Sequence, residues 1–162
     1  MRNIAVVTGA TGMDGSHLMD MLVERGWEVH GLVRRNSTRN TWRIEHLMDR
    51  IQLHVGDLTD QPSLEGVFRS VQPTHIWHLG AQSFVGASFN TPIATSEVTG
   101  LGTLRVLESA RTVCPEARIY IASSSEMFGS SESQSLSLYR PASPYGIAKV
   151  FSHHIAGLYR EA

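Results

Sequence analysis

Residues 6–15 read Val6-Val7-Thr8-Gly9-Ala10-Thr11-Gly12-Met13-Asp14-Gly15, an apolar run that breaks into three glycines at intervals of three. The apolar run predicts a short buried strand over residues 3–7, and the residues from Gly12 onward predict an amphipathic helix. In such a turn Gly9 allows the tight bend, Gly12 lets backbone N–H groups approach an anion, and Gly15 lets helix and strand pack closely. The turn therefore predicts a pyrophosphate site at a helix N-terminus, where unpaired N–H groups and the helix dipole favour negative charge. A glycine-rich turn without a ligand is the alternative interpretation.

The composition excludes several classes of protein. The 162 residues suffice for one domain with its own hydrophobic core, and a formal net charge of −1 gives no argument for nucleic acid or an anionic membrane as partner. Cys114 is the single cysteine, which excludes an intrachain disulfide and a cysteine zinc site. Because no apolar run could span a bilayer and residues 1–3 lead directly into a strand, we expect a soluble, cytoplasmic protein without a signal peptide.

Short apolar runs alternate with helical patterns along the chain, which is typical of a parallel sheet covered on both faces. Further strands are expected at residues 28–33, 51–56, 75–79 and 118–122, and helices at 43–47, 60–71, 95–112 and 144–160. Gly26 is expected to cap the first helix. The predicted fold class is α/β, a doubly wound parallel sheet of the Rossmann type in three layers (α/β/α), with residues 1–162 forming one dinucleotide-binding domain.

The second predicted strand ends in Arg34-Arg35-Asn36-Ser37. Sites for NAD usually carry an acidic residue here, which accepts from the ribose 2′-OH, whereas a 2′-phosphate needs guanidinium groups. The two arginines therefore favour NADP over NAD. A solvated basic loop is the alternative.

The third and fourth predicted strands end in residues suited to the rest of such a cofactor. Asp57 could accept from an adenine amino group and Leu58 could cover the ring, although Asp57 could equally cap its own turn. The fourth strand leads into Gly80-Ala81-Gln82-Ser83. These small residues would let the backbone approach a ligand in the crevice at the carboxyl ends of the strands.

The residues that could carry chemistry follow the fifth predicted strand. Ser124 and Glu126 leave the sheet at the same edge, and Ser143 is expected to cap a helix that begins at Pro144. Tyr145 and Lys149 are four residues apart and would share one face of that helix. A unit charge about 4 Å away, at an effective dielectric constant of about 20, stabilises a phenolate by about 4 kcal/mol. Lys149 could therefore make Tyr145 a usable base, with a solvated helix edge as the alternative.

With these motifs in place, the sequence resembles the extended short-chain dehydrogenase/reductases and, within them, the GDP-mannose 4,6-dehydratase family. The glycine motif and the Tyr145/Lys149 pair mark the superfamily only. The more specific matches are Met13-Asp14-Gly15-Ser16, the Arg34-Arg35 pair and Arg43-Ile44-Glu45-His46-Leu47.

The resemblance implies an NADP site and a catalytic set. The implied catalytic residues are Ser124, Glu126, Tyr145 and Lys149. Tyr145 and Lys149 would also touch the cofactor, together with Gly9, Ala10, Thr11, Gly12, Met13, Asp14, Gly15, Arg34, Arg35, Asn36, Ser37, Asp57, Leu58, Leu79, Gly80, Ala81, Gln82 and Ser83. Three positions depart from the family pattern, because Ser124 replaces a usual Thr, Met13 a usual Gln and Ala94 a usual Tyr. Ser124 keeps the hydroxyl of the usual Thr. Met13 and Ala94 are not expected to make the side-chain contacts to the cofactor that the usual Gln and Tyr make.

The implied reaction is the NADP-dependent dehydration of GDP-D-mannose to GDP-4-keto-6-deoxy-D-mannose. Tyr145 would take the proton of the sugar 4-OH, Ser124 would bond the same oxygen and Glu126 would remove the C5 proton. For Glu126 a surface carboxylate is the alternative. Two other functions stay open, namely another NADP-dependent nucleotide-sugar epimerase or reductase of this fold, and a non-catalytic dinucleotide-binding remnant.

The family members are longer than this chain and carry the sugar-nucleotide pocket in the part that follows. We therefore expect these residues to bind NADP weakly and not to turn over GDP-mannose alone. The resemblance also implies a homo-oligomer, a dimer through helices 95–112 and 144–160 or a tetramer through the segment after Arg35. No metal is expected, because His75 and His78 fall on opposite faces of a strand and His153 and His154 are adjacent on a helix.

Overall fold

A five-stranded sheet with the order β3-β2-β1-β4-β5 organises the chain. The computed structural model describes residues 2–35, 40–129 and 139–161. Within the sheet, β1 pairs in parallel with β2 and β4, and β2 with β3. The strands are β1 (Ile4–Thr8), β2 (Glu28–Val33), β3 (Gln52–Val55), β4 (His75–His78) and β5 (Arg118–Ile121). Every end lies within one residue of its predicted position, which confirms the predicted α/β fold class.

The strand order reverses at the central strand β1, because β2 and β3 lie on one side of it and β4 and β5 on the other. In sheets of this kind, ligands bind beyond the carboxyl ends of the strands at that point. The glycine turn follows β1 directly. The topology therefore places the predicted phosphate-binding turn at the switch point.

The chain packs as two compact units, which we describe separately. Unit 1 comprises Met1–Gly80 and Arg105–Tyr120, and unit 2 comprises Ala81–Leu104 and Ile121–Ala162. Unit 1 holds nearly all of the sheet. Unit 2 holds the helix that carries Tyr145 and Lys149.

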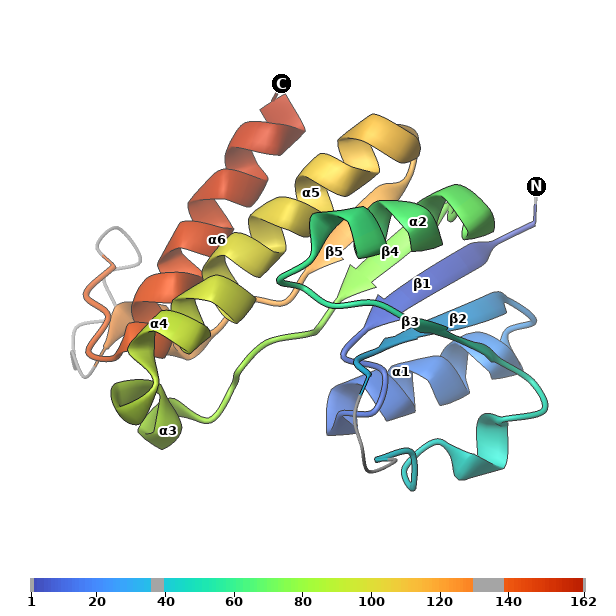
Figure 1. Ribbon diagram of the computed structural model, residues 1–162, viewed down its shortest axis with the longest axis horizontal. Coiled ribbons are helices and arrows are strands. Elements are labelled where there is room, and N and C mark those ends of the chain that lie inside the picture. The colour runs from blue at the N-terminus through green and yellow to red at the C-terminus, as the bar shows by residue number, and fades with distance from the viewer. Residues whose placement is uncertain (1, 36–39, 130–138, 162) are drawn as a thin grey trace. The chain divides into compact units, whose positions relative to one another are not determined.

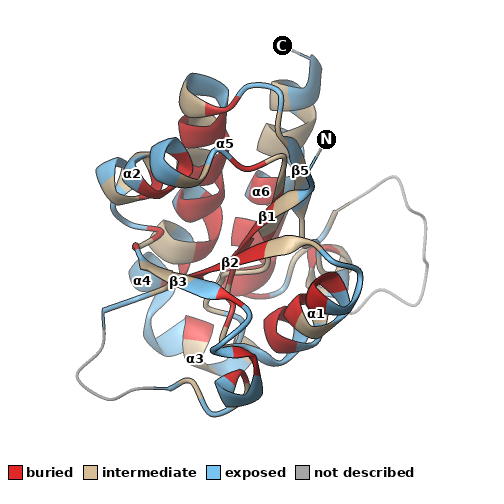
Figure 2. Cartoon of the chain, turned by 90° about the vertical axis from the view of Figure 1, so that its right-hand side faces the viewer, coloured by how far each residue is buried: buried red, intermediate tan, exposed pale blue. Residues whose placement is uncertain are grey.

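In unit 1, helices cover both faces of the sheet. Helices α1 (Met13–Glu24) and α2 (Gln61–Val71) lie on opposite faces (Figure 1). On the α1 side, Met19 and Leu22 join Val7 in one hydrophobic cluster, whereas α2 contributes the fully buried Phe68. The buried residues accordingly gather along β1, β2 and the inner side of α1 (Figure 2). Burial from both faces explains why β1 is a continuous apolar run rather than an alternating one.

The ends of these two helices follow the sequence signals. Gly26 has φ +75° after the last turn of α1, and its N–H donates to the Val23 carbonyl at 3.0 Å. This left-handed residue confirms the predicted C-terminal cap. Helix α2 begins close to the predicted residue 60 and has Pro62 in its first two positions, where a proline is well tolerated.

The predicted short helix at 43–47 is a 3₁₀ turn, η1 (Glu45–Leu47). Ile44 is fully buried and Leu47 nearly so, and both belong to the cluster beneath α1. His46 Nε2 lies 2.6 Å from Asp20 Oδ1 on α1. This segment is therefore fixed to α1 by packing and by one hydrogen bond.

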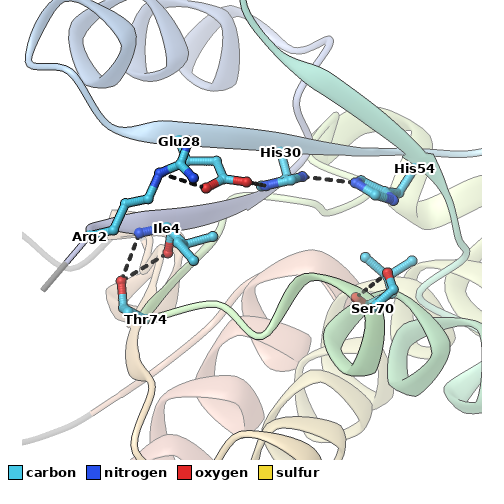
Figure 3. A network of polar contacts seen from close by, with 8 residues as sticks. Arg2, Ile4, Glu28, His30, His54, Ser70 and Thr74 are labelled. Carbon is cyan, nitrogen blue, oxygen red and sulfur yellow. Dashed lines mark hydrogen bonds and ion pairs between the residues drawn. The ribbon is translucent and has the colours of Figure 1, made fainter.

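A polar network in unit 1 runs across β2 to β3 (Figure 3). Arg2 pairs with Glu28 at 3.0 Å, Glu28 Oε1 lies 3.1 Å from His30 Nε2, and His30 Nδ1 lies 2.9 Å from His54 Nε2. Burial, together with the neighbouring His30, lowers the pKa of His54 below its usual value. Because the unfolded chain then binds this proton more readily, the His54 contribution to stability declines as the pH falls below the usual histidine range.

Unit 2 corrects the prediction of one α-helix over residues 95–112. The helical run begins earlier, with α4 (Pro92–Thr95), continues as a π-helical segment, η2 (Ser96–Leu101), and ends as α5 (Gly102–Val113), whose last part belongs to unit 1. The Thr99 carbonyl accepts the hydroxyls of Thr103 at 2.8 Å and Ser152 at 3.0 Å. Thr103 donates from the next turn of the same run and Ser152 from another helix; these bonds support the widened turn, and no sequence period signals them. The short helix α3 (Val85–Asn90) is a further element that the sequence did not predict.

Helix α6 (Pro144–Glu161) matches the predicted helix and packs on η2 in unit 2. A Cβ added to Gly100 would lie 3.8 Å from the Cα of Ala148. Gly100 therefore lets the backbones of η2 and α6 approach each other closely. Of the helices within residues 2–35, 40–129 and 139–161, none combines the length and apolar character that a membrane span requires.

Candidate functional site

The glycine turn of unit 1 has the close contacts that its sequence predicts. The chain bends at Gly9 with φ +72°, a left-handed conformation that favours glycine, and the Gly12 N–H donates to the Gly9 carbonyl at 2.9 Å. A Cβ on Gly9 would lie 2.9 Å from the Gly80 nitrogen, and one on Gly15 would collide with the Gly9 carbonyl oxygen. Gly9 therefore makes the predicted tight bend, and Gly15 lets the start of α1 pack closely against the turn.

The N-terminus of α1 is left without a side-chain cap. Its N-cap residue is Gly12, which makes no side-chain hydrogen bond to the first turn. The N–H groups of that first turn therefore need acceptors from outside the helix, and a phosphate supplies them together with favourable charge. The bare backbone cradle fits the pyrophosphate of a dinucleotide.

Thr8 and His78 join the ends of the two strands that flank the switch point. The Thr8 hydroxyl lies 2.7 Å from His78 Nδ1 and accepts from the Gly80 N–H at 3.0 Å, and both side chains are buried. This bond fixes the loop after β4 against the glycine turn. The sequence analysis did not predict this pair. The signal for it would have been that a polar residue ends each of two apolar strands.

Asp57 follows β3 and caps its own turn. Its Oδ1 accepts the Thr59 backbone N–H at 2.9 Å and the Thr59 hydroxyl at 2.8 Å. Burial alone would raise the pKa of Asp57, but the two Thr59 bonds and the positive charges of Arg34 and Arg105 outweigh burial and lower it. The structure thus shows the turn-capping role, with Arg34 close enough to act on the carboxylate.

The remaining predicted residues of unit 1 surround this edge. Leu58 is buried, and a Cβ on Gly80 would lie 3.0 Å from its Cδ1, so the loops after β3 and β4 touch. Arg34 and Arg35 are exposed at the end of β2. Asn36 and Ser37 lie outside the described residues. Unit 1 therefore brings together the predicted binding residues for the adenosine and pyrophosphate parts of a cofactor.

In unit 2, the start of α6 carries the predicted Tyr145/Lys149 pair. The Gly146 N–H donates to the Ser143 hydroxyl at 3.0 Å, which confirms the predicted cap. Lys149 Nζ lies 5.8 Å from the centroid of the Tyr145 ring and donates to the Ala122 carbonyl at 2.8 Å. Both side chains are buried, and burial lowers the pKa of Lys149. The pair shares one helix face, as predicted.

Ser124 and Glu126 lie beside this helix start. The Ser124 hydroxyl accepts from the Glu126 N–H at 3.2 Å at the beginning of η3 (Ser125–Phe128). A Cβ on Gly146 would lie 2.6 Å from the Glu126 carbonyl oxygen, so the backbone of Glu126 touches the residue next to Tyr145. Unit 2 thus brings together the backbone segments that carry a hydroxyl, a carboxylate, a phenol and an ammonium, groups suited to proton transfer.

Gln82, a predicted cofactor-binding residue, has a buried side-chain oxygen without a hydrogen-bond partner among the described residues. Its N–H donates to the Thr99 hydroxyl at 3.1 Å and its amide nitrogen donates to the Phe84 carbonyl at 3.2 Å. A ligand N–H or O–H would satisfy the unpaired Oε1. Across the described part of the chain, no three histidine, cysteine or carboxylate side chains gather as a metal ion would require.

A parallel sheet with a glycine turn after β1 and a tyrosine and lysine four residues apart on α6 defines the class of Rossmann-type short-chain dehydrogenase/reductases. Within that class, the family model for GDP-mannose 4,6 dehydratase matches residues 6–162. The chain belongs to this family. The predicted family is thus confirmed.

Individual relatives agree with the family match. GDP-mannose 4,6 dehydratase of Homo sapiens is 44% identical over 174 residues, which cover 99% of this chain and 47% of the human protein. GDP-mannose 4,6-dehydratase of Vibrio cholerae is 40% identical and covers 99% of this chain and 46% of its own length. Among solved structures, UDP-glucose 4-epimerase of Thermus thermophilus in complex with NAD has a TM-score of 0.84 at 29% identity, over 98% of this chain and 51% of that chain. The chain spans about half the length of the curated relatives it matches.

Proposed function

We propose that this chain is the dinucleotide-binding part of a GDP-mannose 4,6-dehydratase, a lyase that converts GDP-D-mannose to GDP-4-keto-6-deoxy-D-mannose. The observation that carries the proposal is the grouping in unit 2 of Glu126 with Ser124, Tyr145 and Lys149. A reaction that only moves a hydride at C4 needs the last three. Removal of water also needs a base for C5, and Glu126 supplies a carboxylate.

The proposed cofactor is NADP. The glycine turn and the uncapped start of α1 would hold its pyrophosphate, and Arg34 and Arg35 support a 2′-phosphate over a ribose hydroxyl. The unpaired Gln82 oxygen would accept from the cofactor or its ligand. The solved epimerase relative in complex with NAD supports a nicotinamide dinucleotide in this fold. When bound, the cofactor accepts a hydride from C4 of the hexose and returns it to C6.

Tyr145 would act as the base at the hexose 4-OH. The Lys149 ammonium would stabilise the phenolate. Lys149 Nζ is itself held in place by its hydrogen bond to the Ala122 carbonyl oxygen, 2.8 Å away. At an effective dielectric constant of about 20, a unit charge 5.8 Å away, the distance from Lys149 Nζ to the Tyr145 ring centroid, contributes about 3 kcal/mol. Ser124 would donate its hydroxyl hydrogen to the same sugar oxygen. These residues remove one proton from the 4-OH while C4 becomes a ketone.

Glu126 would carry out the elimination. The new C4 ketone acidifies the C5 hydrogen, so the carboxylate takes that proton. The proton then leaves with the C6 hydroxyl as water, and C5 and C6 form a double bond. When C6 is reduced, C5 regains a proton, which balances the proton that Tyr145 removed.

The proposal predicts that Glu126→Gln lowers dehydration by about 10²- to 10⁴-fold, because the amide cannot take the C5 proton. Oxidation at C4 should persist, so that reduced nicotinamide accumulates and absorbs in the near ultraviolet. The measurement is product formation and absorbance with GDP-mannose, made on the native polypeptide that carries these residues. Glu116→Gln, at an exposed position of unit 1, is the matched control and should leave both signals unchanged.

An unimpaired Glu126→Gln variant would favour a second candidate, a nucleotide-sugar epimerase or reductase of the same fold. The solved epimerase relative favours that candidate. A non-catalytic dinucleotide-binding protein is the third possibility, and it predicts no turnover with any nucleotide sugar.

A self-association surface is also proposed on α6. Ile147, Phe151 and Leu158 lie on one helix face, and their exposed fractions are 59%, 39% and 59%. Apolar residues repeated on one exposed face favour burial against a second copy of the chain. A homo-oligomer, one dinucleotide-binding domain over residues 1–162 and a cytoplasmic location complete the proposal.

A further inference from the structure

Unit 2 contains a cluster of buried hydroxyl groups that the proposed reaction does not use. Its members, Thr99, Thr103 and Ser152, are each 1% exposed. The Ser152 hydroxyl on α6 lies 3.0 Å from the Thr99 carbonyl oxygen and 3.1 Å from the Thr103 hydroxyl oxygen. The Thr103 hydroxyl donates to the same Thr99 carbonyl at 2.8 Å. Because unpaired buried polar groups are costly, this hydroxyl cluster fixes α6 against the helical run that contains η2.

Thr99 also bonds a third part of unit 2. Its hydroxyl oxygen accepts the backbone N–H of Gln82, in the loop after β4, at 3.1 Å. One residue therefore holds this loop through its side chain and α6 through its backbone carbonyl. On α6, Lys149 lies three residues before Ser152, and both side chains are buried, so the bond to Ser152 is made one turn from the Lys149 ammonium.

The two parts that Thr99 joins carry groups that the proposed reaction uses. The Gln82 side-chain oxygen is buried without a partner among the described residues and is free for a ligand donor. Lys149 belongs to the proposed catalytic set. Thr99 itself lies within the π-helical segment η2, and π-helical turns inside α-helices are rare and occur frequently at functional sites.

We propose that Thr99 is a positioning residue, which fixes the Gln82 loop against the face of α6 that carries Lys149. The assignment rests on the proposed dehydratase function. Thr99 acts through Gln82 and Ser152 and not on the reacting atoms. A ligand that contacts both Gln82 and Lys149 reacts only when the two are held in the right geometry. A displacement of about 1 Å can cost about 100-fold in rate.

Thr99→Val tests the assignment, because valine keeps the branched shape and removes the hydroxyl. In the native polypeptide, kcat with GDP-mannose should fall by about 10- to 100-fold while KM stays within about threefold, since positioning acts on the reacting geometry. Thr99→Ser retains the hydroxyl and should keep kcat within about threefold of the wild type. Steady-state kinetics of the three proteins give this comparison.

A second measurement needs no ligand. Amide hydrogen exchange, followed by NMR in the 162-residue chain, reports on the Gln82 N–H directly. Thr99→Val should speed exchange at Gln82 by about 10-fold, the scale of one lost hydrogen bond, and Thr99→Ser should not. Unchanged exchange at Gln82 in Thr99→Val would overturn the proposal, whatever the enzyme's substrate.

Ser152→Ala breaks the same connection from the α6 side and should also lower kcat. The losses of Thr99→Val and Ser152→Ala should not add in the double variant, because both changes remove one connection. Fully additive losses would mean two independent effects and would overturn the coupling.

Thr95→Val is the matched control. Thr95 is fully buried in the same helical run, but its hydroxyl donates only within that run, to the Thr91 carbonyl at 2.8 Å. This variant should leave kcat and Gln82 exchange unchanged. An equal loss of kcat in Thr95→Val, or full activity in Thr99→Val, would contradict the positioning role. A wild-type enzyme without turnover of GDP-mannose would instead overturn the proposed function, and Gln82 exchange would still decide whether Thr99 holds the loop.

Discussion

Gly15→Ala is expected to weaken NADPH binding by the chain by about 100-fold or more and to lower its melting temperature. The added Cβ would collide with the Gly9 carbonyl oxygen and lie 2.9 Å from the Gly9 carbonyl carbon. Both atoms are backbone, so the phosphate-binding turn itself must shift. Overpacking of this kind costs typically about 1–3 kcal/mol of stability. Binding should fall further, because the phosphate donors move with the turn.

Gly66→Ala on α2 is the matched control. Nothing lies within 4 Å of a Cβ added there. Since alanine is favoured over glycine in a helix interior by about 0.5–1 kcal/mol, this variant should melt slightly higher and bind NADPH as the wild type does. Fluorescence titration and thermal melts of the three chains give both quantities. Wild-type affinity in Gly15→Ala would contradict the proposed role of the turn.

Tyr145→Phe is expected to reduce turnover by about 10²- to 10⁴-fold in the native polypeptide, because the proposed proton acceptor at the 4-OH is lost. The ring is buried and Lys149 stays bonded to Ala122, so folding should change little. Affinity for NADPH should likewise stay close to that of the wild type. Steady-state rates with GDP-mannose and a separate NADPH titration distinguish these effects.

Tyr120→Phe is the control for Tyr145→Phe, since the side chain of Tyr120 is half exposed on β5. It should retain full turnover. If Tyr145→Phe were fully active, the residue would not be the base. If it lost turnover only in proportion to its stability, Tyr145 would be a packing residue.

The elements that could be predicted are those with local causes. The strands follow from apolar runs, the start of α6 from Ser143 and Pro144, and the end of α1 from Gly26. The family motifs also named the residues that each unit brings together, from Gly9 to Gly15 in unit 1 and from Ser124 to Lys149 in unit 2. In these cases a few neighbouring residues decide the conformation.

The features that could not be predicted depend on residues far apart in the chain. The π-helical segment η2 is stabilised by a hydrogen bond from the Ser152 hydroxyl to the Thr99 carbonyl, 53 residues earlier in the chain. The spacing of apolar residues does not indicate such a bond. The bond between Thr8 and His78 joins two strands that are adjacent only once the sheet forms. The position of Arg43 on the glycine turn likewise requires the packing of Ile44 beneath α1.

The central claim is that a dinucleotide binds the glycine turn of unit 1. Hydrogen–deuterium exchange of the chain with and without NADPH tests it directly. The account predicts slower exchange, on adding NADPH, at residues 9–15, with little change around Gly66 in α2. Unchanged exchange at residues 9–15 would contradict it.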